Sequence, residues 1–197
     1  MSDANPRGFT PARRLDGQPP ARAKLYPTGG RNRAQIYRGD VVYLDTNGEL
    51  QRVDFSPASA TQRGLLGVVQ AVYNENKRPF THNLPATGHY IAASTTGFAA
   101  VVDDPDCVFI VELESPCTNA AVGQWCNVTA NAPNTAAGYS RLRVADVTAT
   151  SIGHPFKILG LAYTELAVTA AGSNNNDVEV IITNHMWRKA RTNNTMS

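Results

Sequence analysis

Residues 40–53 read DVVYLDTNGELQRV, and this stretch indicates the fold class more clearly than any other part of the chain. Two short runs of apolar and β-branched residues flank the dipeptide Asn47-Gly48. Asn-Gly readily adopts the positive φ angles of a tight turn, so the pattern is typical of a β-hairpin. We therefore expect strands at 40–44 and 49–53, joined by a turn.

Similar short apolar runs recur along the chain, separated by clusters of turn-forming residues. About ten short strands indicate a mainly β protein, with a single β-sandwich or β-barrel-like body over residues 39–186. The runs 65–73 and 156–163 are both apolar with internal glycine, and this similarity suggests that they are neighbours in a sheet. The glycines of the first run favour a bulged or closely approached backbone. The other predicted strands are 89–93, 97–102, 108–114, 125–129, 141–147 and 178–184, and short helical turns are expected at 58–63 and 116–122.

Charge is distributed unevenly along the chain. Residues 1–38 carry eight Lys or Arg against two Asp, a balance of +6, whereas residues 39–180 carry seven against fourteen, a balance of −7. The first segment, interrupted by prolines and glycines, cannot bury enough apolar surface to offset its ordering entropy alone. We expect an extended basic N-terminal arm that is disordered in isolation and becomes ordered on a neighbouring subunit. A solvated, disordered tail is the alternative, and residues 187–197 are expected to form a short flexible C-terminal tail.

The three cysteines, Cys107, Cys117 and Cys126, lack the paired short spacing of a zinc site or of a secreted disulfide framework. We interpret them as reduced, mostly buried thiols of a protein made in a cytosol. No window of about 20 apolar residues predicts a membrane span, and no N-terminal apolar run predicts a secretory signal. A membrane is therefore not an expected partner.

The sequence contains no recognisable motif for catalysis or phosphate binding, and its four histidines are isolated, as structural or surface histidines are. The one acidic cluster is Asp103-Asp104-Pro105-Asp106. A cation site or an acid and base pair is the weaker interpretation, because the spacing matches no calcium loop. Turn capping is the stronger one, and an acidic rim would also suit a basic arm from another copy. We expect no enzyme activity, no catalytic residue, no metal and no cofactor.

Nucleic acid is a candidate partner for the basic arm, which has aromatic residues among its arginines. An acidic body would repel phosphate, and no base-reading helix or aromatic strand platform is predicted. We therefore expect no direct contact with nucleic acid.

Six short motifs in chain order carry a resemblance to a known family: GFxP at 8–11, GDxV at 39–42, GVVxxVY at 67–73, VxDDPDxxFxV at 101–111, LGL at 159–161 and VxVxIxxH at 178–185. Together they resemble the head-decoration, or cement, proteins of tailed bacteriophages. The resemblance implies a homotrimer, with a homodimer as the alternative, made in the bacterial cytoplasm and bound to the outer surface of the virion. It also implies a structural role, in which the protein binds across neighbouring major capsid subunits. A host-binding module, or another head or tail component of the virion, is the alternative.

Under this interpretation both chain ends contact partners. Basic residues would meet carboxylates on capsid subunits or sister copies, and apolar residues would fill small pockets. Trp187 would anchor the C-terminus, with packing on its own body as the alternative. The candidate partner-binding residues are Arg7, Phe9, Arg13, Arg14, Leu15, Arg22, Lys24, Leu25, Arg31, Arg33, Asp103, Asp104, Asp106 and Trp187.

Overall fold

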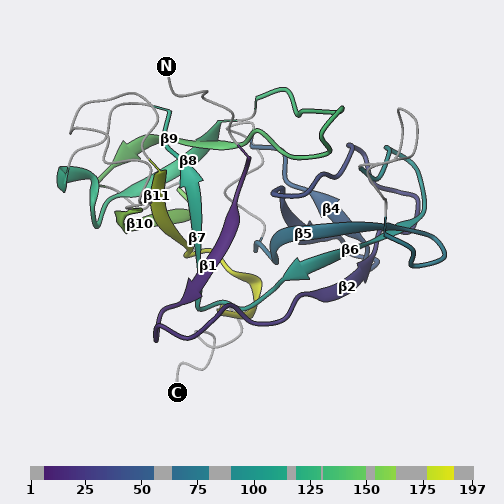
Figure 1. Ribbon diagram of the computed structural model, residues 1–197, viewed down its shortest axis with the longest axis horizontal. Coiled ribbons are helices and arrows are strands. Elements are labelled where there is room, and N and C mark those ends of the chain that lie inside the picture. The colour runs from purple at the N-terminus through teal and green to yellow at the C-terminus, as the bar shows by residue number, and fades with distance from the viewer. Residues whose placement is uncertain are drawn as a thin grey trace.

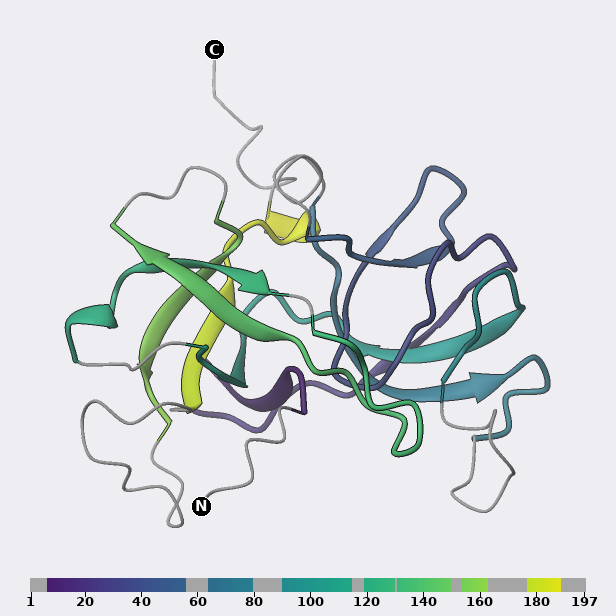
Figure 2. The same ribbon diagram turned by 90° about the horizontal axis from the view of Figure 1, so that it is seen from above.

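The structure is a computed structural model that describes residues 7–55, 64–79, 90–114, 119–129, 131–149, 154–162 and 177–188. Within these ranges the protein is mainly β, as the sequence predicts, and its strands form two antiparallel sheets. Figures 1 and 2 show the sheets next to each other, with the N-terminal segment running along both. The predicted helical turn at 58–63 lies outside the described residues.

The six-stranded sheet has the order β1-β7-β11-β10-β8-β9, and the five-stranded sheet has the order β2-β6-β5-β3-β4. Both sheets are open, which gives the body a sandwich-like rather than a closed-barrel architecture. The helical turn predicted at 116–122 corresponds, in its described part, to the short 3-10 helix η1 (Asn119–Ala121). The strands are β1 (Thr10–Arg14), β2 (Lys24–Pro27), β3 (Val41–Leu44), β4 (Leu50–Arg52), β5 (Gly67–Asn74), β6 (Gly97–Val102), β7 (Cys107–Glu112), β8 (Trp125–Thr129), β9 (Arg143–Thr148), β10 (Phe156–Leu161) and β11 (Asp177–Ile182).

The predicted hairpin is confirmed as β3 and β4. The Asp45 carboxylate accepts hydrogen bonds from the backbone amides of Asn47 and Glu49, both at 2.9 Å, and so closes the turn. Gly48 has a φ of 75°, a conformation that glycine adopts without a steric penalty. Asn-Gly and a preceding Asp therefore determine this turn locally.

The central strands of the five-stranded sheet carry buried side chains on both faces. Because successive side chains of a strand point to opposite faces, Val41 and Val68 join a large cluster shared with the six-stranded sheet. Their neighbours Val42 and Val69 join a smaller cluster on the other face. The large cluster also contains Phe156 from β10, so one hydrophobic core joins the two sheets.

Two sequence predictions about strands are wrong. The runs 65–73 and 156–163 are not neighbours, because β5 pairs with β3 and β6, whereas β10 pairs with β8 and β11. Similar apolar composition reflects similar burial and does not specify a pairing partner. The run 89–93 forms no strand in its described part, where Ile91 makes an isolated bridge to Ile36. The bulged backbone predicted for 65–73 is present, since the register of β5 with β6 shifts between Val69 and Ala71.

The described part of the N-terminal segment, residues 7–38, lies on the body of its own chain, which corrects the prediction that this segment needs a neighbouring subunit to become ordered. β1 pairs with β7 at the edge of one sheet, and β2 pairs with β6 at the edge of the other. Phe9 is 2% exposed and belongs to the shared core, so it does not fill a pocket on a partner. The segment is ordered because it contributes edge-strand hydrogen bonds and a core side chain. The charge and prolines of its sequence give no indication of either.

Gly8 allows this segment to approach the body closely. Gly8 has a φ of 68°, and a Cβ at this position would lie 2.7 Å from the carbonyl oxygen of Gly39. That same carbonyl accepts a 3.0 Å hydrogen bond from the amide of Phe9. The backbone therefore enters the body immediately before the buried phenylalanine.

Candidate partner-binding surface

The acidic cluster predicted from sequence forms the turn between β6 and β7, where the chain passes from one sheet to the other. We refer to residues 103–106 as the acidic turn. The Asp104 carboxylate accepts a 2.9 Å hydrogen bond from the amide of Asp106, so the predicted capping role is confirmed. Among the described residues, no group of three or more His, Cys, Asp or Glu side chains is placed to hold a metal ion.

Asp103 is the buried member of the acidic turn. Its carboxylate accepts hydrogen bonds from Lys24 Nζ at 2.8 Å and from Tyr26 Oη at 2.7 Å. Burial alone would raise the pKa of Asp103, but the hydrogen bonds from Lys24 and Tyr26 lower it below its ordinary value. Asp103 therefore fastens β2 to the acidic turn as an ionised group.

The other two carboxylates of the acidic turn bind one arginine from the N-terminal part of the chain and one from its C-terminal part. Asp104 lies 2.8 Å from Arg14 Nε at the end of β1, and Asp106 lies 2.8 Å from Arg188 Nη2. The acidic cluster does meet a basic N-terminal segment, but that segment belongs to the same chain. This corrects the expectation of a basic arm from another copy.

Exposed apolar residues lie beside these charged contacts. Leu15 is 47% exposed, and its amide donates a 2.9 Å hydrogen bond to the carbonyl of Asp106. Trp187 is 44% exposed and directly precedes Arg188, the ion-pair partner of Asp106. We call the surface formed by Leu15, Asp106, Trp187 and Arg188 the turn face.

The C-terminal part of the turn face rests on a rigid base. His185 is fully buried, and its Nδ1 accepts a 3.2 Å hydrogen bond from the amide of Trp187. Burial lowers the pKa of His185 to about 4, so the ring is neutral at neutral pH. The amide of Met186 also donates a 2.8 Å hydrogen bond to the carbonyl of Leu65. Trp187 thus projects from a short segment fixed to the body, although residues 189–197 of the predicted tail lie outside the described residues.

The remaining candidate residues of the N-terminal segment lie in different surroundings. Arg13 makes an ion pair with Glu179 of β11 at 2.6 Å, so its partner is also in the same chain. Leu25 is 48% exposed, and it lies on the opposite face of β2 from Lys24 and Tyr26 because side chains alternate along a strand. Arg22 is exposed and makes no ion pair with a described residue.

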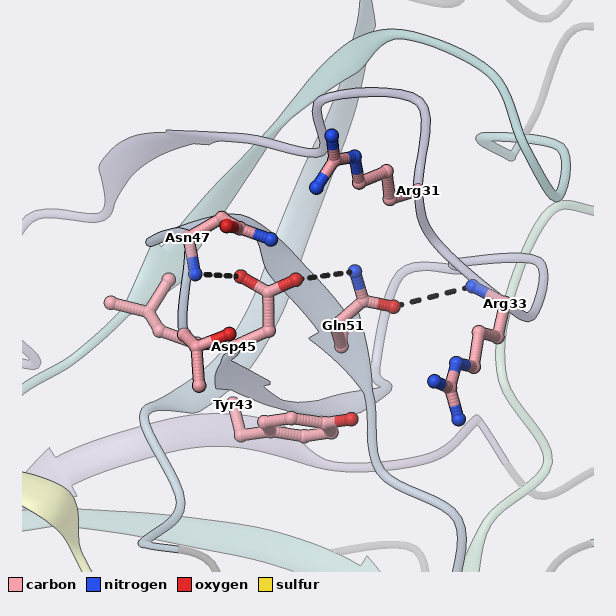
Figure 3. A pocket seen from close by; sticks show the side chains of 8 residues that line it. Arg31, Arg33, Tyr43, Asp45, Asn47 and Gln51 are labelled. Carbon is pink, nitrogen blue, oxygen red and sulfur yellow. Dashed lines mark hydrogen bonds between the residues drawn. The ribbon is translucent and has the colours of Figure 1, made fainter.

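Arg31 and Arg33 line a surface pocket of about 560 Å³ between the loop after β2 and the β3–β4 hairpin (Figure 3). The amide of Arg33 donates a 3.2 Å hydrogen bond to Gln51 Oε1, which joins the loop to the hairpin. Sequence analysis suggested the two arginines but missed the hairpin residues that face them, because the turn motif predicts only the local conformation. The hairpin residues that line the pocket are Tyr43, Leu44, Asp45, Thr46, Asn47 and Gln51.

A second feature that sequence analysis missed is a pair of carboxylates in the six-stranded sheet. Glu112 and Asp177 face each other across β7 and β11. Burial raises the pKa of both, while Arg143 opposes the effect at Glu112 and Arg7 opposes it at Asp177. Each carboxylate thus has a neighbouring arginine, an arrangement typical of structural ion pairs. Only the pairing of two distant strands reveals this contact.

The two described cysteines are free, buried thiols, as predicted, and Cys117 lies outside the described residues. Burial raises the pKa of Cys107 to about 12, which makes its thiol unreactive at neutral pH. Among the described residues, no helix has the length and apolar character needed to cross a membrane.

We compared the chain with protein-family models, with curated proteins and with solved structures, and none of these comparisons returned a match.

Proposed function

We propose that this protein is a structural component of a bacteriophage virion, which decorates and stabilises the capsid by binding across neighbouring major capsid subunits. The proposal combines the resemblance of the six motifs to decoration proteins with the geometry of the turn face. It includes a homotrimer bound to the outer surface of the shell. The protein has no catalytic role in this proposal.

The turn face is the observation that carries the proposal. Leu15 and Arg188 are distant in the sequence but both contact Asp106, and the exposed Trp187 directly precedes Arg188. Protein interfaces commonly combine an aromatic anchor with surrounding charged groups, and Trp and Arg are enriched among the residues that contribute most to binding. Because the acidic turn holds Arg14 and Arg188, little conformational entropy is lost when a partner covers the segments that carry them.

The structure also changes how the proposal is tested. Removing residues 1–38 would delete β1, β2 and Phe9 from the body, so loss of binding by that truncation would not identify a contact. Substitutions of the exposed residues avoid this problem. The informative variant is Leu15→Ser combined with Trp187→Ser. Val122→Ser is the matched control, because Val122 is 42% exposed but follows η1 and lies outside the turn face.

The assay is co-sedimentation with shells assembled from the major capsid protein of the virus that encodes this chain. We expect the wild-type protein and the control to coat the shells to saturation. Loss of an aromatic interface residue commonly costs about 2 kcal/mol or more, so the double variant should bind at least about 30-fold more weakly. Failure of the wild-type protein to bind shells would contradict the proposal, and unchanged binding by the double variant would exclude the turn face as the contact.

A further inference from the structure

The pocket between the loop after β2 and the β3–β4 hairpin is lined by two arginines from the loop and by the Asp45 carboxylate from the hairpin. Figure 3 shows Arg31 and Arg33 on the loop with their guanidinium groups pointing apart, that of Arg31 toward Asn47 and that of Arg33 toward Tyr43, and with Asp45 and Gln51 between them. Both arginines are exposed, and among the described residues neither makes an ion pair. They differ in this respect from Arg13 and Arg14 of the same segment, whose guanidinium groups are paired with carboxylates.

Asp45, the carboxylate that lines the pocket, is held in place by hydrogen bonds within the hairpin. Asp45 Oδ1 accepts hydrogen bonds from the backbone amides of Asn47 and Glu49, and Asp45 Oδ2 lies 3.5 Å from Gln51 Nε2. Burial would raise the pKa of Asp45, but the hydrogen bonds from these groups lower it, so the carboxylate stays ionised and can only accept hydrogen bonds. Gln51 is itself held by the amide of Arg33. These hydrogen bonds therefore fix Asp45 and Gln51 in the absence of a ligand.

The two arginines and Asp45 together restrict which ligands the pocket can bind. Guanidinium groups are donors that favour a carboxylate or a phosphate. Asp45 requires hydroxyl or amine donors and repels a ligand that is anionic throughout. The volume of about 560 Å³ is in the range of small-molecule sites and exceeds what a single oxyanion needs.

We propose that this pocket binds an acidic sugar, with its oxyanion at the guanidinium group of Arg31 or of Arg33 and its hydroxyl groups against Asp45, Asn47 and Gln51. The oxyanion is a carboxylate or a phosphate, since the arginines accept either. This inference goes beyond capsid binding and does not depend on it, because no residue that lines the pocket belongs to the turn face.

The test is a titration of the full-length protein followed by amide chemical shifts. The probes are glucuronate, glucose 6-phosphate, neutral glucose and inorganic phosphate, each up to about 50 mM because single small ligands often bind with millimolar affinity. We expect saturable shifts for residues 31–33 and 43–51 with glucuronate, glucose 6-phosphate or both, and the response identifies the oxyanion. Glucose and inorganic phosphate should bind at least about tenfold more weakly. Glucose has no oxyanion for the arginines, and inorganic phosphate has no sugar hydroxyl groups for Asp45, Asn47 and Gln51.

The variants are Arg31→Gln and Arg33→Gln, with Arg78→Gln as the control, since Arg78 is also exposed but does not line the pocket. Loss of a charge-assisted hydrogen bond should weaken binding by about tenfold or more in at least one of the first two and by less than about twofold in the control. The proposal is overturned if no probe shifts these residues, if inorganic phosphate binds as tightly as the acidic sugars, or if the pocket variants bind like the control. All three variants should still coat shells, so failure here is distinguishable from failure of the proposed function.

Discussion

Replacing Phe9 by Ala tests whether the N-terminal segment is part of the body. The Phe9 ring is almost fully buried, stacks on Phe156 with ring centroids 4.9 Å apart, and lies in the core shared by the two sheets. Truncation of a buried Phe to Ala typically costs about 3–5 kcal/mol, which includes about 0.5–1.5 kcal/mol from an aromatic pair. We expect Phe9→Ala to lower the free energy of unfolding by about 4 kcal/mol, and the melting temperature by roughly 10 °C for a domain of this size.

The measurement is urea unfolding of the wild-type and variant proteins, followed by tryptophan fluorescence and by circular dichroism. Leu15→Ala is the matched control in the same segment, and because Leu15 is about half exposed its loss should cost less than about 1 kcal/mol. If residues 1–38 were a disordered arm, both variants would unfold like the wild-type protein. A loss of less than about 0.5 kcal/mol for Phe9→Ala would therefore refute the docked position of the segment.

Three further predictions concern buried titratable groups. Burial lowers the pKa of His185 in the folded state to about 4, against 6.5 for an ordinary histidine. As the pH falls below 6.5, the unfolded chain binds a proton at this residue that the folded protein does not bind. The free energy of unfolding should therefore drop by about 2 kcal/mol between pH 7 and pH 5. His185→Gln should abolish this part of the pH dependence, and an unchanged slope would show that another group causes it. Asp103→Asn removes the charge that Lys24 and Tyr26 bind and should destabilise the protein by about 1–3 kcal/mol in chemical unfolding at pH 7. Because the pKa of Asp103 is lowered in the folded state, its contribution to stability is present above the pKa of an ordinary Asp and is lost as the pH falls through the folded-state pKa. An Asp103→Asn variant as stable as the wild-type protein would contradict this role. Cys107 and Cys126 should react with a thiol reagent only after unfolding, and rapid labelling of either in the native protein would show that they are accessible.

Sequence analysis predicted the elements whose conformation is specified locally. The hairpin of β3 and β4 is one example, because Asp45 and Gly48 determine its turn without help from the rest of the chain. The long apolar runs of β6 and β7 are another, since their composition alone requires burial. β1 and β2 escaped prediction because TPARR and KLYP are edge strands, which depend on hydrogen bonds to β7 and β6 more than on their own side chains.

The candidate site was predictable in its chemistry and not in its geometry. An acidic turn and a basic segment of opposite charge suggested an ion-paired contact, and Asp104 with Arg14 forms one. The sequence could not show that the contact is within one chain, because charge does not distinguish a neighbouring copy from the protein's own body. The pocket beside Gln51 depends on a hydrogen bond from Arg33, a contact between distant residues that no local pattern indicates.

A reconstruction of the virus particle in which we propose this protein to reside tests the proposed function most directly. We predict density for the protein on the outside of the shell, as trimers that span neighbouring capsid subunits, with Leu15 and Trp187 of the turn face against the shell. Density inside the shell against the genome, or the turn face directed toward solvent, would contradict the proposal.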